Sequence, residues 1–167
     1  MIEQHFLDDS LRQFRKLKAQ ADRAVAQVED RQLFATLDDE SNSIAVIMKH
    51  IAGNMRSRWT DLLTTDGEKP DRQRDTEFEL SATDTRAGLL AAWDDGWSRA
   101  LGAIQALAPV DLQKTIYIRG EAHTVLEAIG RQMAHYAGHV GQIVLLAKHY
   151  AGPGWKTLSL PRAPKHP

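Results

Sequence analysis

Apolar residues recur every three or four positions along four stretches of the chain, and each stretch predicts an amphipathic helix. In the first stretch, four apolar side chains share one face at seven-residue spacing: Leu7, Phe14, Ala21 and Val28. A helix buries such a face against other helices, so the pattern predicts an all-α fold. The four predicted helices cover about residues 3–29, 43–63, 84–107 and 125–150.

Polar residues mark where three of these helices begin. Ser41 or Asn42 is a candidate cap for the second helix, and Thr83 or Asp84 for the third. Thr124 is followed three residues later by Glu127, the spacing of a capping box, which predicts the start of the fourth helix.

The connections differ in character. Residues 65–80 are charged and contain turn signals, so they predict a long loop. The segment "TIYIRG", 115–120, favours a short strand followed by a turn, and hence a hairpin before the last helix. We expect one four-helix-bundle domain over residues 1–167, with helices 84–107 and 125–150 as antiparallel neighbours and a proline-rich tail over 151–167.

The composition excludes several classes of function. The 167 residues include 21 Lys and Arg against 22 Asp and Glu, so no overall positive charge favours nucleic acid or an anionic membrane. Neither a targeting segment nor a membrane-spanning run is evident, and we expect a cytoplasmic protein. The chain has no cysteine, so a reactive thiol would have to come from another molecule.

Candidate chemistry lies in the fourth helix, in the segment "AHYAGHVG". His135 and His139 are four residues apart, which places them on the same face of a helix, about 5–6 Å apart at Cβ. Neutral imidazole is a good ligand for zinc, nickel, copper or iron, so the pair predicts part of a metal site. His50, in the second helix, is the best third ligand; the terminal residues His5 and His166, together with His123 and His149, fit less well.

Three histidines would leave open positions on a metal ion, as in catalytic zinc sites. The alternative is that the three side chains only pack or lie at the surface. Asn54, Gln142 and Arg131 are close enough along their helices to orient the imidazoles or to bind a substrate, and Gln132 belongs with them. The other reading is that they are polar residues where the bundle opens to water.

The loop charges have two readings as well. They can cover the site as a lid or form an ordinary solvated loop; the residues are Arg72, Arg74, Asp75 and Glu77. The aromatic side chains Tyr136, Trp59, Trp93 and Trp97 are expected in the core or at a dimer interface.

Three segments resemble the DinB/YfiT-like superfamily, in a branch of uncharacterised bacterial proteins. They are "DGEKPDRQRDTEF", "RGEAHTV" and "HYAGHVGQI", and the resemblance extends over nearly the whole chain. It implies a four-helix bundle, commonly a homodimer, with a divalent metal held by His50, His135 and His139. Zinc or nickel is the expected metal, with iron or manganese as alternatives.

Characterised relatives in that superfamily include S-transferases that use low-molecular-weight thiols. The resemblance therefore implies a metal-dependent enzyme, with thiol transfer preferred and metal-assisted hydrolysis of a small molecule second. A dimeric metal-binding module without turnover is the alternative from another class. One fold hosts many functions, so the activity follows from the resemblance only by analogy.

Overall fold

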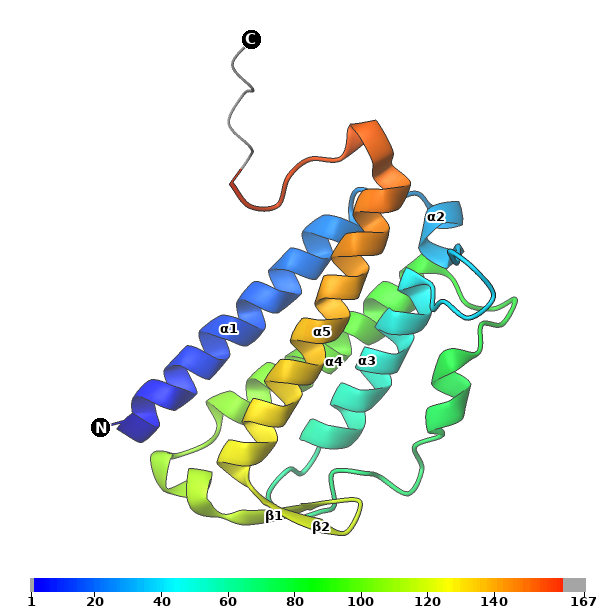
Figure 1. The fold of residues 1–167 in the computed structure, drawn as a ribbon. Coiled ribbons are helices and arrows are strands. Elements are labelled where there is room, and N and C mark those ends of the chain that lie inside the picture. Colours follow the sequence, from blue (N-terminus) through cyan, green and yellow to red (C-terminus); the bar gives the residue numbers. More distant parts are fainter. Residues whose placement is uncertain (1, 161–167) are drawn as a thin grey trace.

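The computed structural model describes residues 2–160 and is mostly helical within that range (Figure 1). It contains five α-helices, three short 3-10 helices and one two-stranded hairpin. The α-helices are α1 (Ile2–Val25), α2 (Asp30–Phe34), α3 (Ile44–Trp59), α4 (Arg86–Gln105) and α5 (Val125–Ala151). The remaining elements are η1 (Arg74–Phe78), η2 (Pro109–Gln113), β1 (Thr115–Ile118), β2 (Glu121–Thr124) and η3 (Gly152–Gly154).

All four predicted helices are present, but the first two end earlier than expected. α1 ends at Val25 and not near residue 29, and a separate helix, α2, follows it. The Arg86 guanidinium donates to the carbonyls of Val25 and Val28, so a tertiary contact occupies acceptors that a longer helix would use. α3 ends at Trp59 because Asp61 adopts a φ of +50°, which turns the chain.

Two of the three cap assignments also move by a residue or two. Ser43 caps α3 and Thr85 caps α4, each accepting a hydrogen bond from a backbone N–H three residues on. The predicted capping box of Thr124 and Glu127 at the start of α5 is confirmed.

The four long helices pack in two close pairs, α1 with α5 and α3 with α4. The two helices of each pair run parallel to each other, and the two pairs run in opposite directions (Figure 1). In the second pair Lys49 contacts Asp84 near the two starting ends. Further along, Gly96 faces Ala52 and Met55, and a Cβ at Gly96 would come within 3.2 Å of both residues. The missing side chain allows these two helices to approach closely.

One predicted helix pairing is wrong. Among the described residues, α5 packs mainly against α1 and α3 and makes few close contacts with α4. The segment that joins α4 to α5 crosses the end of the molecule, where η2 and the hairpin lie (Figure 1). Although α4 and α5 are close in sequence, the segment between them therefore connects two helices that are not adjacent in the packing.

The predicted hairpin is confirmed, whereas the predicted loop 65–80 contains a short helix. β1 and β2 pair antiparallel, with Arg119 and Gly120 at positive φ in the turn. Within the predicted loop 65–80, the 3-10 helix η1 packs against α3. No helix within residues 2–160 is long and apolar enough to cross a membrane.

The buried apolar side chains form one contiguous cluster. Its centre contains Phe14, Trp59, Trp97 and Tyr136, and the ring of Phe14 lies 5.7–6.2 Å from the other three. These aromatic side chains and Trp93 are buried in the core. Of the two expected locations, the core and a dimer interface, they therefore occupy the core. The predicted row of Leu7, Phe14, Ala21 and Val28 is buried as well.

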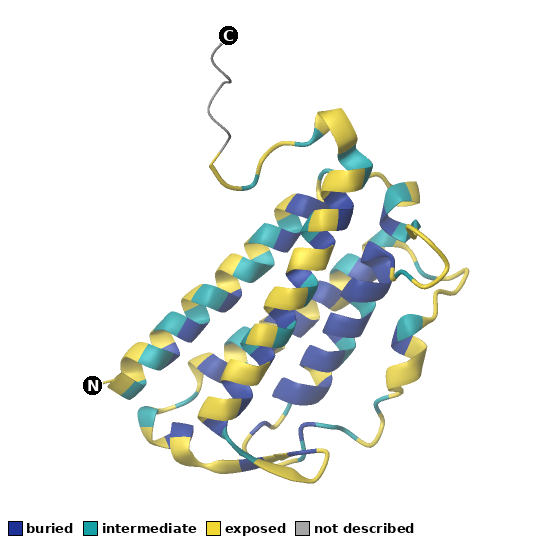
Figure 2. Ribbon diagram, viewed as in Figure 1, coloured by how far each residue is buried: buried dark blue, intermediate teal, exposed yellow. Residues whose placement is uncertain are grey.

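α3 is buried on nearly every side, whereas α1 and α5 show only a buried stripe (Figure 2). α4 and α5 pack against it, and η1 covers a further face. Polar side chains of α3 are therefore enclosed, among them His50, Asn54, Ser57 and Arg58. Buried polar groups need partners, which makes this helix the place to look for a functional site.

Candidate metal centre

Three histidines converge between α3 and α5. His135 Nε2 lies 3.4 Å from His50 Nε2 and 3.1 Å from His139 Nε2. One ring nitrogen from each of the three side chains lies within 4.8 Å of the other two. Nitrogen ligands of a tetrahedral zinc ion lie about 3.4 Å apart, given Zn–N distances of about 2.0–2.1 Å. The cluster could hold a divalent metal ion.

The outer nitrogens of two of these rings have fixed partners. His50 Nδ1 lies 2.9 Å from Glu77 Oε2, and His139 Nδ1 lies 2.8 Å from Gln142 Oε1. Both partners are acceptors, so each Nδ1 carries the proton and donates it. The Nε2 atoms of His50 and His139 then present lone pairs toward His135. This is the arrangement that orients histidine ligands in metal sites.

These tautomers leave the cluster short of a proton. His135 Nε2 can donate to only one neighbour, yet it contacts the Nε2 atoms of both His50 and His139. In the other close contact, the lone pair of the neighbouring Nε2 then faces a nitrogen that offers it no proton. A cation between the three nitrogens would turn both contacts into favourable interactions, so the residues present fit a metal ion.

The surroundings favour the neutral form of His135 and His139. Burial, followed by the nearby His139 and His50 rings, lowers the pKa of His135 to about 4. Burial also lowers the pKa of His139. Metal ions bind the neutral form of histidine, so these side chains need not lose a proton first.

Glu77, named from the sequence only as a possible lid residue, contacts His50, and sequence reasoning missed this contact. It is 7% exposed, and besides His50 it accepts two hydrogen bonds of 2.8 Å from Arg72. Burial by itself would raise the pKa of Glu77, but the hydrogen bonds from His50 and Arg72 outweigh it and lower the pKa. The Phe78 ring lies 4.7 Å from the His50 ring and covers it.

A glycine makes room for this contact. Gly53 lies one turn after His50, and a Cβ there would overlap the Glu77 carboxylate. The predicted lid is therefore half right in its members: Arg72 and Glu77 pack against α3, while Arg74 and Asp75 are exposed. Nothing in the periodicity of residues 65–80 distinguished the two groups.

The three expected neighbours occupy different places. Gln142 bonds to His139, as described above. Asn54 is buried, and its Oδ1 accepts from the Tyr136 hydroxyl at 2.9 Å, not from a histidine. Arg131 is exposed, with Nη1 3.2 Å from His123 Nε2.

The remaining histidines stay outside the cluster. His5 and His149 are exposed on α1 and α5, and His123 lies in β2. His166 lies outside the described residues, as does the end of the predicted tail.

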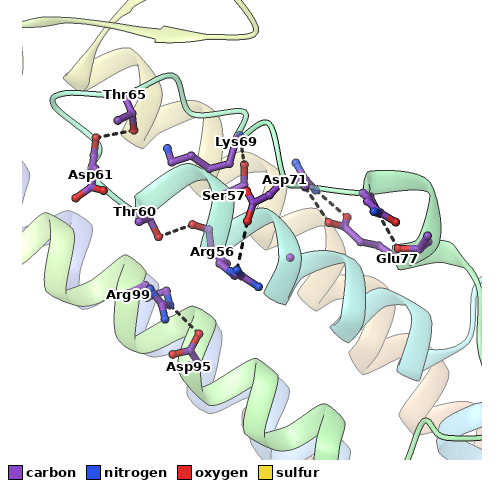
Figure 3. Close-up of a pocket in the computed structure, with 14 residues that line it drawn as sticks. Arg56, Ser57, Thr60, Asp61, Thr65, Lys69, Asp71, Glu77, Asp95 and Arg99 are labelled. Carbon is purple, nitrogen blue, oxygen red and sulfur yellow. Dashed lines mark hydrogen bonds and ion pairs between the residues drawn. The ribbon is translucent and has the colours of Figure 1, made fainter.

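Two cavities flank the covered face of α3. The smaller, about 190 Å³, is lined by His50 and His135 together with Asn54 and Gln132. The larger, about 600 Å³, is lined by residues of α3, α4 and the 60–77 segment (Figure 3). Glu77 lines the larger cavity and also bonds to His50, so one carboxylate contacts both the histidine cluster and this second space. Only the smaller cavity is lined by histidines of the cluster.

The comparisons with known proteins add a family but no activity. No curated protein and no solved structure matches the chain. The family described as "Protein of unknown function (DUF1572)" matches residues 1–164. The chain therefore belongs to this family.

Proposed function

We propose that this protein is a divalent-metal-dependent enzyme whose metal is held by His50, His135 and His139. Thiol transfer to a small electrophilic molecule is the preferred reaction class, with metal-assisted hydrolysis second. The observation that carries the proposal is the convergence of three Nε2 atoms whose outer nitrogens, in two of the rings, are held by Glu77 and Gln142.

The donor set supports zinc or nickel, with iron or manganese as alternatives, because imidazole suits borderline metals. A bound ion of this kind makes the anion of a coordinated water or thiol available near neutral pH. The chain has no cysteine, so a thiol would come from a separate small molecule.

In this proposal, the residues around the metal have distinct roles. Glu77 and Gln142 keep the protons of His50 and His139 on Nδ1 and fix the ring orientations. Arg72 holds Glu77 in its ionised form. His135 and His139 are partly exposed, which leaves the side toward the small cavity open to a ligand.

The resemblance to the DinB/YfiT-like superfamily supports the remaining parts of the proposal. They are a single domain, a four-helix bundle as the description of its fold, a homodimer as the assembly, and the cytoplasm as the location. The pairwise packing of α1 with α5 and of α3 with α4 supports the bundle.

The first test is the metal content of protein purified without an affinity tag, measured by inductively coupled plasma mass spectrometry. We expect near-stoichiometric metal in the wild type and its loss in His135→Ala. His149→Ala is the matched control, since this exposed histidine lies on the same helix away from the cluster. Absence of metal from the wild type after reloading with zinc, nickel, iron and manganese would contradict the proposal.

The alternative from another class is a metal that only ties α3 to α5. The observation that favours it is that the three ligands come from these two helices alone. A structural ion would be required for folding, whereas a catalytic ion would exchange with little effect on the fold.

A further inference from the structure

The small cavity beside the histidines is strongly basic. Besides His50 and His135 it is lined by Arg58, Arg72, Arg74, Arg119 and Arg131. None of the lining residues that the structure describes is an aspartate or glutamate. Guanidinium groups remain charged at all ordinary pH values, so the cavity carries a persistent positive field.

Arg58 is the least satisfied of these arginines. It is 3% exposed, and its Nε and Nη1 atoms have no hydrogen-bond partner among the described residues. Its Nη2 contacts Glu68 Oε2 at 3.4 Å, which is long for a charge-assisted hydrogen bond. A buried charge without adequate partners is costly, and a ligand group that pairs with it removes that cost.

The nearby carboxylates are already shared. Glu68 contacts Arg72 and Arg119 in addition to Arg58. Glu77 is shared between Arg72 and His50. Two glutamates therefore serve three arginines and a histidine, and the only carboxylate that Arg74 contacts among the described residues is that of the exposed Asp75, at 3.5 Å.

A second buried polar group lines the same cavity. Gln132 is 2% exposed, and its Oε1 atom has no hydrogen-bond partner among residues 2–160. Gln132 lies one turn before Tyr136 on α5, so its side chain is anchored on the helix that carries His135 and His139. Among the described residues, the cavity thus combines two unpartnered guanidinium nitrogens with an unpartnered amide oxygen, next to His50 and His135.

We propose that this cavity binds the anionic group of the substrate, a carboxylate or a phosphate, with Arg58 as its principal partner. The inference rests on the proposed metal-dependent function and adds a substrate class to it. The anionic group lies against Arg58, whose Nε and Nη1 atoms can donate to it, and the reacting part of the molecule extends toward the histidine cluster. Gln132 Oε1 is an acceptor, so it would pair with a hydrogen-bond donor of the same molecule and not with the anionic group. Arg131 and Arg119 lie at the exposed rim and attract the anion.

Isothermal titration calorimetry on zinc-loaded protein tests this inference. The probes are succinate, inorganic phosphate and uncharged succinamide, each titrated into protein freed of excess zinc. We expect one or both anions to bind and succinamide not to bind. The stronger anion identifies whether the site prefers carboxylate or phosphate. If neither anion binds, the inference is wrong.

Variants assign the binding to the arginines. Arg58→Gln should weaken anion binding about ten-fold or more, because it removes charge-assisted hydrogen bonds. Arg56→Gln is the matched control, since this exposed arginine lies two residues away on α3 and lines the other cavity. Equal affinity of folded Arg58→Gln and wild type would overturn the inference.

Because Arg58 is buried, the Arg58→Gln variant can fail to fold. Anion binding is therefore also measured in Arg131→Gln. This exposed rim residue should give weaker binding and a smaller dependence of affinity on salt. Unchanged affinity and salt dependence in Arg131→Gln, together with an unfolded Arg58→Gln, would count against the arginine cavity.

Zinc content measured in every preparation separates this inference from the proposed function. Full zinc without anion binding overturns the inference alone. Anion binding by protein that never takes up metal overturns the proposed metal enzyme and supports the arginine cavity as an anion site.

Discussion

At the scale of single residues, the candidate site depends on side chains that contact the imidazoles and not only on the imidazoles. Glu77→Gln should keep the three histidines in place but weaken zinc binding about 10–100-fold, because it removes the charge that polarises His50. The dissociation constant can be measured by competition with a chromophoric chelator. Glu79→Gln is the control, since Glu79 is exposed two residues away. Unchanged affinity in Glu77→Gln would contradict this role.

Three buried side chains next to the candidate site, Trp59, Tyr136 and Asn54, are joined by hydrogen bonds. Trp59 Nε1 donates to the Tyr136 hydroxyl, which donates to Asn54 Oδ1, both at 2.9 Å. Tyr136→Phe leaves the buried Trp59 and Asn54 groups unpaired, so unfolding in urea should show a loss of about 1–3 kcal/mol. Tyr117→Phe, at an exposed tyrosine in β1, should stay within about 0.5 kcal/mol of wild type. Similar free energies of unfolding for the two variants would show that the buried hydrogen bonds of Tyr136 do not stabilise the protein.

At the scale of elements, the packing of η1 against α3 brings Glu77 to His50. Gly53→Ala should displace Glu77 and weaken zinc binding, because a Cβ would overlap its carboxylate. The readout is the zinc dissociation constant together with the unfolding midpoint. Gly102→Ala, on α4 with open space around it, is the control and should stabilise the protein by about 0.5–1 kcal/mol. Normal zinc affinity in Gly53→Ala would mean that η1 does not position the histidine.

Asp66 joins the segment after α3 to the hairpin. Its carboxylate accepts hydrogen bonds of 2.7–2.9 Å from the backbone N–H groups of Glu68, Arg119 and Gly120. Burial by itself would raise the pKa of Asp66, but these hydrogen bonds lower it. The stabilisation is therefore complete above the unfolded pKa, about 3.9, and is lost as the pH falls through the lower folded value.

Asp66→Ala should consequently destabilise the protein by about 1–3 kcal/mol at pH 7. The gap to wild type should narrow as the pH falls below about 4, where the unfolded chain takes up the proton. Thermal unfolding at a series of pH values measures both effects. Asp75→Ala, at an exposed aspartate of the same segment, is the control. A gap that does not change with pH would exclude the carboxylate as its source.

At the scale of the whole molecule, we expect the apolar core to hold the helices together without a metal. The core cluster includes residues from α1, α3, α4 and α5. Metal removal by a chelator should therefore preserve the helical circular dichroism spectrum, with a fall in melting temperature from lost binding energy. His139→Ala should show no further change with chelator. Loss of the helical signal in wild type on chelation would favour the structural-metal alternative.

The sequence alone was sufficient for the long helices and for the pairing of His135 with His139, whereas the meeting of His50 with this pair depends on how α3 packs against α5. The long helices and the pairing depend on local periodicity: an apolar face recurs every three or four residues, and a four-residue spacing brings His135 and His139 together on any helix. The capping box at Thr124 and the turn at Gly120 are likewise local, because each involves residues at most a few positions apart.

Only the tertiary structure decided what lies around those residues. The pairing of α5 with α1 and not with α4, the ending of α1 under the Arg86 contact, and the approach of Glu77 to His50 each join groups far apart in the sequence. The incomplete pairing of Arg58 among the described residues is tertiary as well, since it depends on which carboxylates the 60–77 segment brings near. Periodicity indicates which face of a helix is buried, but it does not indicate which residues of other elements pack against that face.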